Sequence, residues 1–250
     1  MKQNKPKLAI VGYGKMGKEI ELLAHEKGFA VTNIFDIDNP LSSKQKYDFD
    51  VAIEFTTPDS VLENVKTLAR LKKNIVIGTT GWYDKISEVK SIVEKEGIGA
   101  IYSPNFSVGV NILFSVINEV SKIINNFEEY DILVEEIHHR HKKDYPSGTA
   151  LKIAEEILRN VSRKKRITTE LSPNDSDALR IASLRVGETF GIHKIILDSS
   201  FDTIEITHTA KNRKGFALGA LIAAQIIHNK KGFFEFSLKN IENGIYPNSV

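Results

Sequence analysis

The sequence predicts an α/β fold in two parts: a doubly wound parallel sheet, followed by an α+β region with a mixed sheet. Three observations support this prediction. Short β-branched runs alternate with amphipathic stretches in the first hundred residues. After about residue 107 this alternation stops, and three strand-like runs later follow one another closely. Near the C-terminus, an apolar helical stretch returns at 216–228.

The first part is built from repeated strand–helix units. Its predicted strands are the apolar runs Leu8–Val11, Val31–Phe35, Val51–Phe55, Ile75–Gly78 and Gly99–Tyr102. Its predicted helices cover 15–27, 60–71 and 83–95. Because strands alternate with helices of this length, we expect a parallel sheet with right-handed crossovers. Such a sheet places the loops after its strands along one edge, where ligands bind.

The second part has a different pattern. The predicted elements are helices at 109–124 and 147–161 and strands at 131–138, 178–186, 193–197 and 203–209. The polar segment 163–177 is predicted to be a loop. Closely spaced strands are typical of an antiparallel or mixed sheet covered by helices on one face. We therefore predict a dinucleotide-binding domain at 1–107, completed by 213–250, and a second domain at 108–212.

Composition limits the classes of function. The 250 residues are 41% hydrophobic and 26% charged, as in ordinary globular proteins. The absence of Cys excludes disulfides and thiolate chemistry. A net charge of +2 lacks the basic excess typical of nucleic-acid-binding proteins. With neither a signal-peptide pattern nor an apolar run of ~18 residues, we expect a cytoplasmic protein without a membrane partner.

A glycine-rich turn is the first candidate site. It follows the first predicted strand, opens a helix and reads Gly12-Tyr13-Gly14-Lys15-Met16-Gly17. Such a turn allows a pyrophosphate to approach the backbone, and the helix N-terminus adds free N–H groups. We therefore expect a bound dinucleotide; the alternative is a glycine turn without a ligand.

The end of the second predicted strand bears on which dinucleotide binds. Asp36 can accept a hydrogen bond from a ribose 2′-hydroxyl and would repel a 2′-phosphate. Ile37 offers that phosphate no positive charge. Both residues favour NADH, whereas Lys15 is near enough in sequence to leave NADPH possible.

The second candidate site is the run EEIHHRHKKDYPSGTA at 135–150, which holds three of the seven histidines within four residues. Ser147, Gly148 and Thr149 open a helix, so their N–H and hydroxyl groups can bind a carboxylate. Neighbouring Arg and Lys side chains suit an anion and repel a metal ion, so we expect no metal site. A histidine here can exchange a proton near neutral pH. The alternative is a solvated basic loop with an ordinary helix cap.

Two further segments follow the fourth and fifth predicted strands. They are Gly78-Thr79-Thr80-Gly81 and the segment that begins Ser103-Pro104-Asn105-Phe106. Both lie at the sheet edge where the nicotinamide end of a dinucleotide should arrive. Their small and hydroxylated residues allow close approach of the backbone to a ring; simple turn chemistry is the alternative.

Together these motifs resemble the 4-hydroxy-tetrahydrodipicolinate reductase family, formerly called dihydrodipicolinate reductase, over nearly the whole chain. The matching segments are VGYGKMG, Asp36, IGTTGW, SPNFSVGVN, EEIHHRHKKDYPSGTA and THTAKNRKGFALGA. The resemblance implies a Rossmann-type N-terminal domain and a C-terminal domain whose sheet builds a homotetramer. It also implies NAD(P)H-dependent reduction of a small cyclic dicarboxylate in lysine biosynthesis by the diaminopimelate pathway.

The resemblance also implies residue roles. His138 would be the acid/base residue and Lys142 the proton donor, while His139, Gly148 and Thr149 would bind the substrate carboxylates. The implied cofactor-binding residues are Gly12, Tyr13, Gly14, Lys15, Met16, Gly17, Asp36, Gly78, Thr79, Thr80, Ser103, Pro104, Asn105 and Phe106. Arg213 and Phe216 match family positions near the cofactor.

Three positions depart from the commonest family pattern. Ile37 and Thr57 stand where Arg often occurs, which strengthens the expectation of NADH. Tyr145 stands where Ala is frequent, beside the predicted carboxylate site. Two other functions remain open. A different Rossmann oxidoreductase with a small acidic substrate leaves the run at 135–150 unexplained. A redox-sensing module usually carries a DNA-binding element, for which no candidate stands out.

Overall fold

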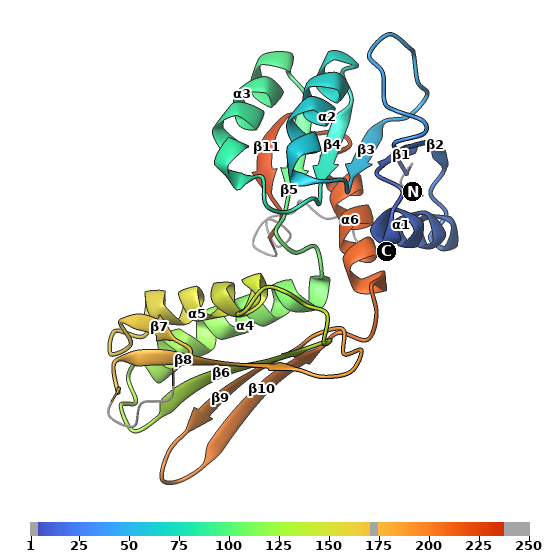
Figure 1. Ribbon diagram of the computed structural model, residues 1–250. Helices are drawn as coiled ribbons and strands as arrows, with labels where there is room; N and C mark the ends of the chain where they lie inside the picture. The colour runs from blue at the N-terminus through green and yellow to red at the C-terminus, as the bar shows by residue number, and fades with distance from the viewer. Residues whose placement is uncertain (1–4, 171–174, 238–250) are drawn as a thin grey trace. The chain divides into compact units, whose positions relative to one another are not determined.

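The chain forms two compact units, and the computed structural model describes residues 5–170 and 175–237 (Figure 1). The first unit is built from residues up to Val108 and from Arg213 onward. The second unit is Gly109–Asn212. Each unit has its own sheet and its own hydrophobic core, so each is described by itself.

The first unit contains a parallel sheet of six strands in the order β11-β5-β4-β3-β1-β2. The strands are β1 Leu8–Val11, β2 Val31–Phe35, β3 Val51–Glu54, β4 Asn74–Ile77, β5 Gly99–Tyr102 and β11 Gly232–Glu235. All residues of β1 and β3 are buried. Central strands covered on both faces read as continuous apolar runs, and such runs identified these strands in the sequence.

Helices cover both faces of this sheet. They are α1 Lys15–Glu26, α2 Pro58–Arg70, α3 Ile86–Glu96 after the 3-10 turn Tyr83–Lys85, and α6 Lys214–Ile227. Alternate residues of β1 enter two cores: Leu8 and Ile10 pack with α1 and α6, whereas Ala9 and Val11 pack with α2 and α3. The doubly wound Rossmann-type architecture predicted from the sequence is confirmed.

The C-terminal segment is tied to the first unit by Asn74 at the start of β4. Its Nδ2 donates hydrogen bonds to the carbonyl oxygens of Ile227, at 2.7 Å, and His228, at 2.9 Å. Its Oδ1 accepts from the Gly99 N–H at 2.7 Å. Asn74 thus satisfies carbonyl groups that the end of α6 leaves without helical partners.

The second unit contains a mixed sheet of five strands in the order β10-β9-β6-β8-β7. The strands are β6 Asp131–His138, β7 Arg166–Thr168, β8 Ala178–Arg185, β9 Ile192–Asp198 and β10 Thr203–Thr209. Strand β6 runs parallel to β8 and antiparallel to β9. Helices α4 Val108–Ile124 and α5 Gly148–Asn160 both lie on one face of the sheet (Figure 1). None of the helices in the described part of the chain combines the length and apolar character needed to cross a membrane.

Two short strands were not predicted. The segment 163–177 was predicted to be a loop, which is wrong for β7, Arg166–Thr168; residues 171–174 lie outside the described residues. Strand β11 was missed as well, and 238–250, the rest of the predicted return, lie outside the described residues. β7 reads RIT and β11 reads GFFE, and neither has the buried aliphatic run that identified the four-residue central strands. These two strands form because β8 and β5 supply pairing partners.

Candidate cofactor pocket and candidate catalytic cluster

The glycine-rich turn brings α1 close to the end of β1. Gly12 has a φ of 95°, and a Cβ there would lie 2.1 Å from the carbonyl oxygen of Phe55. A Cβ on Gly17 would lie 2.2 Å from the Gly12 carbonyl oxygen. Gly14 differs, because no atom lies within 4 Å of its Cβ position. The turn is therefore tightly packed at both ends and open at Gly14, the N-cap of α1.

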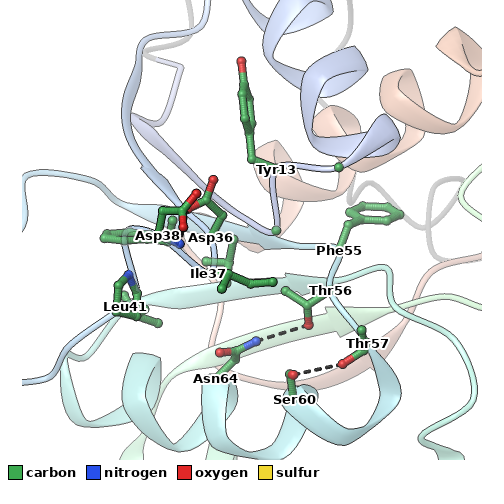
Figure 2. A pocket seen from close by; sticks show the side chains of 15 residues that line it. Tyr13, Asp36, Ile37, Asp38, Leu41, Phe55, Thr56, Thr57, Ser60 and Asn64 are labelled. Carbon is green, nitrogen blue, oxygen red and sulfur yellow. Dashed lines mark hydrogen bonds between the residues drawn. The ribbon is translucent and has the colours of Figure 1, made fainter.

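A pocket of about 680 Å³ lies at the carboxyl ends of β1, β2 and β3 (Figure 2). Its volume falls in the range typical of small-molecule sites. Three strand-end loops and the first turns of α2 form its walls. The lining residues are Val11, Gly12, Tyr13, Gly14, Phe35, Asp36, Ile37, Asp38, Pro40, Leu41, Phe55, Thr56, Thr57, Ser60 and Asn64.

The pocket wall after β2 carries two acidic residues, Asp36 and Asp38 (Figure 2). Asp36 Oδ1 accepts hydrogen bonds from the N–H groups of Asp38 and Asn39, both at 3.0 Å, which orders this loop. Ile37 is 97% exposed. Among the described residues that line the pocket, none is Lys or Arg. This wall therefore suits a hydroxyl group and disfavours a phosphate.

Glu54 lies beneath this pocket with its side chain fully buried. Its Oε1 accepts from the Thr56 hydroxyl and, at 3.3 Å, from the Asn64 amide. Burial raises the pKa of the Glu54 carboxyl, although these hydrogen bonds oppose the shift. The backbone N–H of Thr56 donates to Thr79 Oγ1 at 2.7 Å. These contacts connect the end of β3 to the loop after β4.

Only some of the residues predicted to bind the cofactor line this pocket. Those that line it are Gly12, Tyr13, Gly14 and Asp36. Those that do not are Lys15, Met16, Gly17, Gly78, Thr79, Thr80, Ser103, Pro104, Asn105 and Phe106. Two of the second set serve packing: a Cβ on Gly78 would lie 2.0 Å from the Phe55 ring, and the Phe106 side chain is buried.

A second polar cluster surrounds Glu136 in the second unit. Alternate residues of β6 are buried beneath the helices, and they include Glu136, which is 0% exposed, and His138. Glu136 Oε1 accepts from the Ser147 N–H at 3.0 Å and from Arg185 Nη2 at 3.2 Å. Its Oε2 lies 2.9 Å from His138 Nδ1. One carboxylate thus contacts β6, β8 and the start of α5.

Glu136 remains charged in this setting. Burial alone would raise the pKa of its carboxyl, but its contacts with His138 and Ser147 outweigh burial and hold that pKa well below its usual range. The guanidinium of Arg185 supplies the neighbouring positive charge. A buried carboxylate that loses such partners becomes strongly unfavourable.

The cluster also includes a residue of β9, the strand that pairs with β6 on the other side from β8. Glu136 pairs with His193, whose ring centroid lies 5.1 Å from that of His138. His193 is 4% exposed, and burial, together with the nearby His138, lowers its pKa to about 3. His193 is therefore neutral near pH 7. The next strand adds His208, whose pKa is also lowered by burial.

The start of α5 is held against this cluster. Ser147 caps the helix, since its Oγ accepts from the Ala150 N–H at 3.2 Å. The next residue, Gly148, has no atom within 4 Å of its Cβ position. The first turn of α5 contains no acidic residue. Because Glu136 contacts both Ser147 and His138, the helix start that carries Gly148 and Thr149 is fixed to the strand that carries His138.

The loop between β6 and α5 carries the remaining predicted residues. Lys142 Nζ lies 2.7 Å from Asp144 Oδ1. The rings of His139 and His141 have centroids 6.2 Å apart. The loop therefore presents several cationic or titratable side chains next to the buried cluster.

Glu136, His138 and His193 also meet a geometric condition for metal binding, since their ligand atoms lie within 4.8 Å of one another. The Arg185 guanidinium already neutralises the only carboxylate of the three. A divalent cation would have to share that space with a fixed positive charge. The expectation of no metal site stays a prediction.

Comparison with known proteins decides the family. The model of the dihydrodipicolinate reductase N-terminus matches residues 6–106, and that of its C-terminus matches 109–240. The chain belongs to the dihydrodipicolinate reductase family. The resemblance stated from the sequence motifs is confirmed.

Individual relatives support this membership. A 4-hydroxy-tetrahydrodipicolinate reductase from Christiangramia forsetii is 37% identical over 243 residues, which cover 96% of this chain and 99% of that protein. One from Archaeoglobus fulgidus is 36% identical over 248 residues, covering 88% and 94%. A dipicolinate-bound dihydrodipicolinate reductase from Paenisporosarcina sp. TG-14 has a TM-score of 0.74 at 24% identity, covering 95% of this chain and 100% of that one. This structure supports the fold.

Sequence reasoning gave no role to Glu136, Arg185 or His193. One signal for Glu136 was present, because Ile132, Val134, Glu136 and His138 alternate along β6 and therefore share one face. A carboxylate in line with buried aliphatic residues implies a buried partner. No comparable signal existed for Arg185 and His193, which reach the cluster through strand pairing.

His193 predicts an acid sensitivity of folding. Its pKa is depressed in the folded chain, so below about pH 6.5 the unfolded chain binds a proton that the folded chain does not. The contribution of the neutral His193 side chain to the unfolding free energy is therefore complete above about pH 6.5 and is lost as the pH falls below it. Between about pH 7 and pH 5, His193→Asn should reduce the pH slope of the unfolding free energy, by at most ~1.4 kcal/mol per pH unit.

The slope is measured by urea denaturation at several pH values in this range, above the region where carboxyl groups titrate. His25→Asn provides the matched control, because His25 is exposed on α1. Equal slopes for the wild type and His193→Asn would contradict the assignment of His193 as a buried neutral histidine.

Proposed function

We propose that the chain is a 4-hydroxy-tetrahydrodipicolinate reductase of lysine biosynthesis. It transfers hydride from a nicotinamide cofactor to (2S,4S)-4-hydroxy-2,3,4,5-tetrahydrodipicolinate and yields tetrahydrodipicolinate and water. The observation that carries the proposal is the cluster around Glu136, which joins the strand of His138 to the start of α5. The reductase names of relatives matching nearly the whole chain agree with it.

The pocket at the ends of β1, β2 and β3 fits a dinucleotide. The tight turn at Gly12 and Gly17 and the open backbone at Gly14 leave room for a pyrophosphate at the start of α1. When bound, the nicotinamide supplies the hydride. The proposed cofactor residues are Gly12, Tyr13, Gly14, Lys15, Met16, Gly17, Asp36, Gly78, Thr79, Thr80, Ser103, Pro104, Asn105 and Phe106.

We further propose that NADH is preferred over NADPH. Asp36 and Asp38 face the pocket together, and neither Ile37 nor Thr57 supplies positive charge. Thr57 instead pairs with Ser60 through their hydroxyl groups, at 2.9 Å. A 2′-phosphate here would meet two carboxylates, whereas a ribose hydroxyl can donate a hydrogen bond to one of them.

The second unit is the proposed substrate-binding and tetramerisation domain. N–H groups of Gly148 and Thr149 at the start of α5, together with His139, bind the substrate carboxylates. Loss of the 4-hydroxyl group and a neighbouring ring proton as water leaves a conjugated imine. Hydride addition to this imine leaves electron density that must be protonated, and Lys142 delivers this proton while His138 acts as acid/base residue. The carboxylate of Glu136 contacts His138 Nδ1 at 2.9 Å and so orients its ring.

The enzyme is proposed to work in the cytoplasm on this small molecule, with neither a nucleic-acid nor a membrane partner. The net charge of +2 supports the first exclusion, since binding to phosphate backbones depends on basic excess. Its proposed macromolecular partners are further copies of the same chain.

A homotetramer is the proposed assembly. Both helices of the second unit lie on one face of its sheet (Figure 1), and the opposite face bears Leu133, Ile137, Leu184 and Ile196. These aliphatic side chains lie among charged ones such as Glu135 and Lys194 on the face away from the helices, and their partial exposure favours association between identical copies. Light scattering should then give a molar mass close to four times the 28.0 kDa of one chain. A mass equal to one chain at all concentrations would contradict the assembly.

The proton-donor role of Lys142 is tested by Lys142→Ala. NADH affinity should stay nearly unchanged, because the proposed cofactor pocket lies in the first unit. Turnover should fall by ~10²-fold or more, as is typical when a general acid is lost. Substrate is generated by condensing pyruvate with aspartate semialdehyde, and NADH oxidation is followed by absorbance.

Lys143→Ala is the matched control, since Lys143 is the next residue along the chain and exposed. It should retain wild-type turnover. Unchanged turnover in Lys142→Ala would overturn the role of Lys142. A folded wild-type protein that binds NADH but oxidises neither cofactor with this substrate would overturn the function itself.

Cofactor preference is tested by Ile37→Arg. The side chain is almost fully exposed, so an arginine fits without strain and can pair with a 2′-phosphate. The ratio of kcat/KM for NADPH to that for NADH should rise by about tenfold, which corresponds to one added charge-assisted hydrogen bond. Ile37→Gln controls for side-chain length. A wild type that prefers NADPH would show the proposed preference to be wrong.

A further inference from the structure

Arg185 lies beside the end of β6, where the loop that carries Lys142 begins. It ends β8, and the parallel pairing of β6 with β8 places it directly opposite His138. Pairing continues beyond this point, since the Val186 N–H donates to the His138 carbonyl oxygen at 2.9 Å. The Arg185 side chain is only 19% exposed. Its backbone position is therefore fixed by the sheet.

The guanidinium of Arg185 contacts two separate segments. Its Nη2 lies 3.2 Å from Glu136 Oε1 on β6 and 2.7 Å from the carbonyl oxygen of Asp144 in the following loop. Its central carbon lies 5.9 Å from the centroid of the Tyr145 ring, within cation–π distance. Arg185 thus connects the buried carboxylate to the loop before α5.

Asp144 makes two contacts, one through its backbone and one through its side chain. Its carbonyl oxygen accepts from Arg185, while its side chain contacts Lys142 Nζ at 2.7 Å. Burial by itself would raise the pKa of the Asp144 carboxyl, but the hydrogen bond from Lys142 and its charge lower that pKa. The charged carboxylate therefore keeps its contact with the lysine. A continuous series of contacts runs from Glu136 through Arg185 and Asp144 to Lys142.

We propose that Arg185 is a positioning residue that holds the Lys142 loop at a fixed distance from His138. The inference rests on the proposed function, in which these two side chains handle protons. Arginine suits this task because its planar group directs several N–H donors to acceptors in different directions. A lysine could retain the charge beside Glu136, but it would lack the second nitrogen, which in Arg185 is Nη1 and donates to the Leu184 carbonyl oxygen at 2.7 Å, and the planar group near the Tyr145 ring.

The first experiment compares Arg185→Ala and Arg185→Lys with the wild type. Both variants should lower kcat by ~10-fold or more, because Lys142 is no longer held in place. The Kd for NADH should not change, since the proposed cofactor pocket belongs to the other unit. Guanidinium chloride, added far below denaturing concentrations, should restore part of the kcat of Arg185→Ala, and sodium chloride should not.

The second experiment is a double-mutant cycle with Lys142. If Arg185 acts through Lys142, then Lys142→Ala/Arg185→Ala should have nearly the same kcat as Lys142→Ala alone. A general disturbance of the site would instead multiply the two losses. Arg180→Ala is the matched control, because Arg180 lies on the same strand and donates to the Glu170 carbonyl oxygen at 2.9 Å. Its kcat should stay within about twofold of the wild type.

These outcomes separate the two proposals. If the wild type shows no substrate-dependent NADH oxidation, the proposed function is wrong, and the positioning role of Arg185, which rests on that function, is wrong with it. An active wild type with unchanged kcat in folded Arg185→Ala defeats the positioning role alone, and so do multiplying losses in the cycle. If Arg185→Ala does not fold, Arg185→Lys preserves the charge next to Glu136. Wild-type kcat in Arg185→Lys would then overturn the proposal.

Discussion

The second unit depends on the buried carboxylate of Glu136. Removal of a carboxylate from water costs several kcal/mol unless hydrogen bonds and opposite charge compensate for it. Here the compensation comes from Arg185 on β8, the Ser147 N–H at the start of α5 and His138 on the same strand. Each partner belongs to a different part of the unit. Satisfying one charge therefore fixes a strand pair, a helix start and an imidazole together.

Steric contact plays the corresponding role in the first unit. The Gly12 and Gly17 positions leave no room for side chains, so α1 begins directly against the ends of β1 and β3. This packing aims the N-terminus of α1 at the pocket while leaving Gly14 open. Close backbone packing thus leaves the start of α1 open as the proposed pyrophosphate site, in contrast to the network of ionic contacts around Glu136.

The distribution of charge divides the proposed chemistry between the two units. The pocket of the first unit carries Asp36 and Asp38, which disfavour an additional phosphate. The loop of the second unit carries Lys142 and two histidines, His139 and His141, next to a helix start, and these groups favour a dicarboxylate. A net charge of +2 for the whole chain conceals this contrast, because composition averages over sites.

The sequence alone determined the architecture, the glycine turn, Asp36 and the run that carries His138 and Lys142, because helical and strand periods and turn residues are local properties. Tertiary structure decided the rest. β7 and β11 exist through their pairing partners. Arg185 and His193 are far from His138 in sequence, and only the register of β6 with β8 and β9 brings them to Glu136. Each strand's alternation shows which of its residues are buried, but which residues of two strands lie opposite one another is settled only when their buried faces come together in the sheet.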